Sequence, residues 1–208
     1  MIFLFGERIH STELDAGERE CPVCGQARAF VRVVETNYFT VFGLRLLPID
    51  RVADYQRCTV CNNAFSEDAR EPTHVPVVRR AIVYMMVGYG MTEHEETADQ
   101  ICRKVTGFDF SADELMQLRR SIDAGSEDFF DILRRKSASM NIAGKQQVIQ
   151  AAFLMAYVSC EMQHEDRVRL NLVGNAMGVP IEFVTDCIEK VRARHYYGIR
   201  RLLPTSAT

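Results

Sequence analysis

Apolar and β-branched residues gather in short runs over the first 70 residues, a pattern typical of β-strands. The runs predicted to be strands are Phe30–Val34, Tyr38–Phe42 and Leu44–Ile49. Gly43 separates two of them and Pro48 ends the last, because proline has no N–H to give to a strand ladder. Asp54–Arg57 is also expected to be extended. This part of the chain is therefore predicted to be built from several short strands.

After residue 76 the apolar positions recur at i, i+3 and i+4, which predicts helices. Helices are expected over 77–89, 92–106, 111–120, 127–136, 148–160, 165–177 and 181–197. Thr92 and Ser111 each precede a glutamate by three residues, the pattern of a capping box. Ser126 is a third candidate N-cap, and Gly107 and Gly178 are candidate helix ends.

A polar, proline-marked stretch over residues 66–76 separates the two patterns. We therefore predict two domains, residues 1–70 and residues 71–208, and an α+β fold in which strands precede a larger all-α helical bundle. Within the bundle, Tyr84-Met85 and His94-Glu95 recur as Leu154-Met155 and His164-Glu165, a constant offset of 70 residues. This faint repeat predicts two related helical units.

The composition favours a folded protein in the cytoplasm. Apolar residues make up 47% of the 208 residues, and the formal net charge is −3. A protein that grips nucleic acid over its whole surface is usually clearly basic. No run approaches the roughly 18 apolar residues of a membrane span, and the apolar start Met1–Phe5 is too short for a secretory signal.

Four of the seven cysteines form two CxxC pairs, Cys21-Pro-Val-Cys24 and Cys58-Thr-Val-Cys61. Two such pairs supply the four thiolates of a tetrahedral zinc site. We predict one structural Zn²⁺ bound by these four residues, with no open position for catalysis. The competing interpretation is a redox dithiol, but neither pair lies in the βαβ unit that a thioredoxin-like motif needs. The three single cysteines, Cys102, Cys160 and Cys187, are expected to be buried and inert.

Other candidate chemistry is weaker, and no catalytic or cofactor-binding residue is predicted. Acidic residues and histidines at 93–96 and 164–166 suit a divalent metal, but helix N-termini attract acidic residues in any case. His94 and His164 lack the HExxH pattern, and a turn is expected to separate Cys160 from His164. Gly144-Lys145 lacks the rest of a phosphate-binding loop. The chain is therefore not predicted to be an enzyme.

The C-terminus carries a basic and aromatic stretch without an acidic residue after Glu189. Its members are Arg192, Arg194, His195, Tyr196, Tyr197, Arg200 and Arg201. Arginines beside aromatic rings can bind RNA or a phosphate-rich surface. The alternative is a cationic helix end that the helix dipole favours.

These residues together resemble two families. The N-terminal part resembles a bacterial zinc-ribbon family with a Phe-rich start, and the matching motifs are Phe3-Leu-Phe5-Gly6, Cys21-Pro-Val-Cys24-Gly25, Phe39-Thr-Val-Phe42, Leu47-Pro48-Ile49, Tyr55 and Cys58-Thr-Val-Cys61. Asn62 stands where that family often has glycine, and asparagine tolerates the left-handed turn. The resemblance implies a small four-cysteine zinc β-ribbon.

The helical part, over about 77–195, is similar to the tellurite-resistance TerB-like domain in its order of buried helix, polar turn and Glu-rich helix start. That family commonly has an Asp-Gly pair after the buried helix, where acidic residues are linked to metal binding. The corresponding positions here are Ser159-Cys160 and Tyr89-Gly90, so a second metal site is not expected. The resemblance implies a stress-related interaction module.

The function expected from these features is that of a zinc-binding, non-enzymatic adaptor or scaffold for a protein partner. The alternative is a nucleic-acid-binding zinc protein that uses the basic C-terminal stretch. The sequence does not indicate a particular partner or an oligomeric state.

Overall fold

A computed structural model describes residues 5–66, 69–125 and 128–202. The chain divides into two compact units. The first unit comprises Met1–Thr73 together with Ala138–Asn141, and the second comprises His74–Ser137 and Ile142–Thr208. Strands fill the first unit and helices the second, so the α+β segregation of the elements agrees with the sequence pattern.

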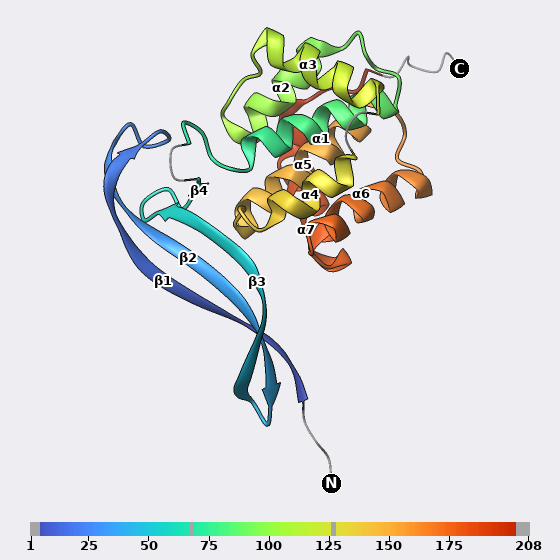
Figure 1. The fold of residues 1–208 in the computed structure, drawn as a ribbon. Helices are drawn as coiled ribbons and strands as arrows, with labels where there is room; N and C mark the ends of the chain where they lie inside the picture. The colour runs from blue at the N-terminus through green and yellow to red at the C-terminus, as the bar shows by residue number, and fades with distance from the viewer. Residues whose placement is uncertain (1–4, 67–68, 126–127, 203–208) are drawn as a thin grey trace. The chain divides into compact units, whose positions relative to one another are not determined.

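The first unit is an antiparallel sheet with the strand order β1-β2-β3-β4. Its strands are β1 (Phe5–Cys21), β2 (Gln26–Val41), β3 (Leu44–Cys58) and the two-residue β4 (Ala64–Phe65). Figure 1 shows the three long strands twisting together along their whole length. The β1–β2 turn carries the first cysteine pair, and the β2–β3 turn lies at the other end of the sheet.

The predicted small zinc ribbon is therefore wrong. The first three strands have 17, 16 and 15 residues, which makes a large curved sheet instead of a compact knuckle with an inserted hairpin. Strand β1 was missed entirely because Phe5–Cys21 is rich in charged residues and has few β-branched ones. The runs Phe30–Val34 and Tyr38–Phe42 belong to one strand, β2, except for Phe42, which lies in the turn that follows it.

Strand β3 continues through Pro48 because of its position in the sheet. Among the described residues, β4 pairs only with Gln56 and Arg57, so β3 is an edge strand at Pro48, and edge strands are where sheets tolerate proline. The register between β2 and β3 shifts three times along the pair. Such irregularities bend the strand and increase its local twist. Phe42 (φ 50°) and Gly43 (φ 78°) form the tight turn between the two strands.

The second unit is all helical (Figure 1). Its elements are α1 (Val75–Gly88), α2 (Glu95–Thr106), α3 (Ala112–Asp123), α4 (Phe129–Ser137), α5 (Ile142–Ser159), α6 (His164–Ala176), α7 (Ile181–Ala193) and a short 3₁₀ turn, His195–Gly198. Helices α1 and α5 pack against each other and bury apolar residues on most of their faces, so they form the core. None of the described helices combines the length and apolar character needed to cross a bilayer.

The helix ends confirm some of the expected caps. Gly107 ends α2 in the left-handed region (φ 81°), and the Ser111 hydroxyl accepts a hydrogen bond from the Glu114 N–H at the start of α3. The Thr92 cap is wrong, because the N-cap of α2 is His94, two residues later. The Ser126 cap lies outside the described residues.

Candidate metal centre

The two CxxC pairs adopt matching turns at one end of the sheet. In the first turn the Gly25 N–H donates to the Cys21 carbonyl (2.8 Å), and in the second the Asn62 N–H donates to the Cys58 carbonyl (3.0 Å). Gly25 and Asn62 both have a left-handed backbone, with φ of 64° and 58°. Asparagine is one of the few residues that adopt this conformation readily, so Asn62 preserves the turn, as predicted.

These turns bring together the four sulfur atoms that the sequence singled out. The Sγ atoms of Cys21, Cys24, Cys58 and Cys61 all lie within 4.8 Å of one another. The Cys21 and Cys61 sulfurs, from different turns, are 3.7 Å apart. With Zn–S bonds of about 2.3 Å, a tetrahedral ion requires sulfur separations of about 3.8 Å. The cluster can therefore hold a metal ion if its more distant sulfurs close in by at most about 1 Å.

The cluster is backed by a small apolar core of its own. Cys21 and Cys58 are fully buried together with Phe30 and Phe65, whose rings meet edge to face at 5.7 Å. The guanidinium of Arg19 lies 4.1 Å from the centre of the Phe30 ring. These contacts fix the strand ends that carry the cysteines, because β1 ends at Cys21 and β3 ends at Cys58.

The surroundings of the thiols set their protonation before a metal binds. Burial raises the pKa of Cys58, but the backbone N–H groups of Cys61 and Val60 and the neighbouring thiols outweigh it and lower that pKa to about 7. Burial raises the pKa of Cys61 to about 12 and also raises the pKa of Cys24. A metal ion that binds these cysteines displaces the protons still held by the thiols. The backbone N–H groups can then donate hydrogen bonds to the metal-bound thiolates.

The other candidate metal residues do not assemble. Across residues 5–66, 69–125 and 128–202, the four cysteines are the one group of three or more potential ligands with ligand atoms this close. The acidic stretches at 93–96 and 164–166 form helix starts instead. Cys160 follows the end of α5 and His164 begins α6, so a turn separates them as predicted.

Cys160 is half-buried, not buried as predicted, and it belongs to a polar cluster around the buried Asp166 that the sequence did not reveal. Asp166 accepts hydrogen bonds from the Tyr89 hydroxyl (2.5 Å), the Gln163 N–H (2.8 Å) and the Cys160 thiol (3.5 Å). The Arg169 guanidinium stacks over the Tyr89 ring at 4.8 Å. Burial and the Asp166 carboxylate raise the pKa of Cys160, so this thiol is not activated. The one available signal was the Gln163–Asp166 spacing of a capping box.

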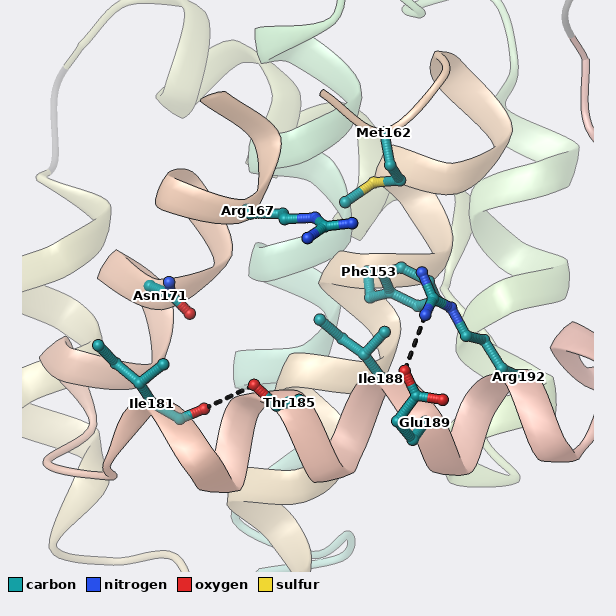
Figure 2. A pocket seen from close by; sticks show the side chains of 9 residues that line it. All are labelled: Phe153, Met162, Arg167, Asn171, Ile181, Thr185, Ile188, Glu189 and Arg192. Atoms are coloured by element: carbon teal, nitrogen blue, oxygen red, sulfur yellow. Dashed lines mark hydrogen bonds and ion pairs between the residues drawn. The ribbon is translucent and has the colours of Figure 1, made fainter. Parts of the chain in front are cut away.

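A pocket of about 270 Å³ lies among α5, α6 and α7 (Figure 2). Its apolar lining includes Phe153 and Ile188, and Arg167 points into it from α6. Arg192 is neutralised by an ion pair with Glu189 (2.7 Å). The lining therefore provides apolar surface and one guanidinium without an ion pair to another lining residue. The lining residues do not include a histidine, cysteine or serine that could act as a nucleophile with a base.

The basic C-terminal stretch is engaged largely in local contacts. Arg194 lies over the Tyr197 ring (5.5 Å), and the Tyr197 hydroxyl bonds to Gln150 on α5. Arg201 lies over the Tyr157 ring at 4.7 Å. Tyr196, with φ of 54°, stacks on Tyr157 at 4.0 Å. The aromatic faces that would stack on bases are thus covered in part by the protein itself. Binding of nucleic acid here stays a prediction.

We compared the chain with models of known protein families, with curated proteins and with solved structures, and it matches none of them. The zinc-ribbon and TerB-like resemblances therefore remain predictions from the sequence motifs.

Proposed function

We propose that Cys21, Cys24, Cys58 and Cys61 hold one structural Zn²⁺ ion and that the protein is a non-catalytic adaptor. The observation that carries the proposal is the cluster of four sulfurs within 4.8 Å, drawn from two matching turns. Four sulfur ligands in tetrahedral positions are typical of zinc or of an iron–sulfur centre. A reducing compartment, expected from the sequence, favours metal binding over disulfides for such pairs.

A zinc ion with four thiolates has no coordination position left for a substrate or an activated water. The role proposed for the metal is therefore mechanical. It joins the end of β1 to the end of β3, two strands separated by β2, and it fixes their register at that end of the sheet. What the sheet then offers is a long, rigid surface for a protein partner.

The experiment is to measure the metal content of the purified full chain and of two variants by mass spectrometry. The wild type should carry about one zinc per chain, and Cys24→Ser/Cys61→Ser should carry almost none. Cys187→Ser, which removes a buried thiol from α7, is the matched control and should keep the ion. Iron in place of zinc, or a metal-free chain that stays folded, would contradict the metal assignment.

The adaptor role needs a separate test. The full chain, purified from its native cell after mild cross-linking, should bring down a partner in stoichiometric amount. Recovery of chaperones alone would argue against an adaptor even if the zinc is present.

A further inference from the structure

The end of the sheet remote from the cysteines exposes large apolar side chains. The exposed fractions are 70% for Phe5 and Leu44, 65% for Leu47 and 61% for Ile9. Phe5 and Ile9 come from β1, and Leu44 and Leu47 from β3; both strands flank β2 near the β2–β3 turn. Isolated exposed apolar residues are ordinary on protein surfaces, but a contiguous group marks an interaction site.

The strand register places this group on one face of the sheet. Residues directly opposite in an antiparallel ladder share a face, and residues two apart on one strand do too. Phe5 pairs with Val41, and Val41 pairs with Leu44. The next row on the same face contains Phe39 and Leu47. We call the set Phe5, Ile9, Phe39, Val41, Leu44 and Leu47 the distal patch.

The paired rows of the opposite face are largely polar, while Leu46 and Ile49, which lie at the register shifts of β3, are also exposed. The paired rows are Gly6, Thr40 and Arg45, then Arg8, Tyr38 and Pro48, then His10, Thr36 and Arg51. The far end of the sheet is thus amphipathic, as an antiparallel sheet is when one face contacts water and the other is covered. Yet, among the described residues of the first unit, Phe5, Ile9, Leu44 and Leu47 are exposed, and Phe39 and Val41 are half-buried. A sheet with an apolar face normally buries that face against another layer.

We propose that the distal patch is a dimer interface, covered by the distal patch of a second copy of this chain. An open apolar side chain of this size presents on the order of 150–200 Å². At their exposures of 61–70%, Phe5, Ile9, Leu44 and Leu47 together therefore present roughly 400–500 Å² of apolar surface. A standard interface buries about 800 Å² per partner, of which about 65% is apolar in homodimers. The two areas agree.

The charges around the patch favour a protein over a lipid surface. Glu7 and Asp50 lie on the same face as the patch, in the rows of Phe39 and Ile9, and Glu7 accepts a hydrogen bond from Asn37 (2.8 Å). Anionic lipid headgroups would repel these carboxylates. At the outer strands, the same groups would form the polar rim that surrounds an apolar interface core.

A second copy of the chain could also bury the distal patch permanently. Two identical amphipathic sheets can stack face to face about 10 Å apart, which gives a two-fold symmetric and self-limiting contact. The cover is then present whenever the chain itself is present. This inference names one partner for the proposed binding role and rests on that role, but not on the identity of the metal.

The test is analytical ultracentrifugation of the zinc-loaded full chain from 1 to 100 µM, on the order of the affinities expected for an interface of this size. We expect a species of twice the 23.7 kDa monomer mass. Leu44→Glu/Leu47→Glu should weaken dimerisation by roughly 100-fold or more, because each new charge would be buried. Ile181→Glu changes a helix residue that is also 61% exposed and is the matched control; it should dimerise like the wild type.

A photo-reactive benzoylphenylalanine at position 47 gives a second readout in an otherwise unchanged chain, and it should cross-link to a product of dimer mass. A wild type that remains monomeric to 100 µM, or a dimer that the double variant leaves intact, would overturn the inference. So would a monomer that floats with vesicles of phosphatidylglycerol, which would identify a lipid cover. Zinc content measured on the same samples keeps this result separate from the metal assignment.

Discussion

His74, at the start of α1, should make the helical unit sensitive to mild acid. Its side chain is 2% exposed, and its Nδ1 has no hydrogen-bond partner among the described residues. Burial lowers its pKa from 6.5 to about 4, although Gln147 opposes this by hydrogen bonding. Between pH 6.5 and about pH 4, His74 is therefore protonated in the unfolded chain but neutral in the folded chain. Stability is complete above pH 6.5 and is lost as the pH falls toward 4.

The size of the effect follows from the two pKa values. The separation of about 2.5 pH units corresponds to about 3 kcal/mol of unfolding free energy lost by pH 4, at about 1.36 kcal/mol per unit. The pKa values of Asp54 and Asp166 are lowered from 3.8, so the stability that these carboxylates contribute is lost only below about pH 4. The window from pH 6.5 to 4.5 is therefore free of these carboxylates.

The assay is urea unfolding followed by helical circular dichroism at several pH values, for the wild type and His74→Gln. Glutamine has no titration in this range, so the variant should lose about 2–3 kcal/mol less than the wild type between pH 7 and 4.5. The comparison uses the pH dependence alone, so any constant cost of the substitution cancels, as does loss of metal in acid. Equal pH dependence of the two chains, within about 0.5 kcal/mol, would refute the reasoning.

Two further predictions concern packing and the thiols. Gly174→Ala should destabilise the chain by about 1–3 kcal/mol despite the higher helix propensity of alanine, because the new Cβ would lie 2.4 Å from a Val184 methyl. Gly6→Ala, whose new Cβ would have no atom within 4 Å, is the control. Equal melting temperatures of Gly174→Ala and the wild type would contradict the prediction. Chelation of the bound metal should expose about four thiols to a thiol reagent, while Cys102 and Cys187, whose pKa burial raises to about 11, should react only on unfolding. A thiol count that chelation leaves unchanged would show that the cysteine cluster holds no metal.

The sequence predicted the parts of this structure that depend on local signals. The helix pattern, the left-handed Gly107 and the Ser111 cap all arise from residues within one or two turns of each other. The cysteine cluster was predictable because the metal-ligand spacing within each pair is itself a local motif, and each pair forms its own turn. The grouping of the four sulfurs required only that the two turns meet.

The sheet could not be predicted in the same way, because strand length is a property of pairing. Nothing local marks Phe5–Cys21 as a strand; the segment is extended because β2 supplies a ladder partner for nearly every residue. Pro48 indicated an end to β3, but the proline lies in a stretch of β3 that is a sheet edge, where proline is tolerated. The buried Asp166 cluster was missed for a related reason, since Tyr89 and Asp166 are 77 residues apart.

The length of the strands separates two sources of stability in the first unit. Sixteen residues of β2 at about 3.3 Å each span roughly 50 Å, so a metal at the cysteine end lies far beyond contact distance of the β2–β3 turn. The ion can hold Cys21 and Cys58 in register, and Phe30 and Phe65 reinforce that end. At the other end, Phe5 and Leu44 lie in one row of the ladder, and each is 70% exposed among the described residues. The proposed coordination would stabilise one end of the sheet only, so the other end needs a different stabiliser, and burial of its apolar face is the one that its residues are suited to provide.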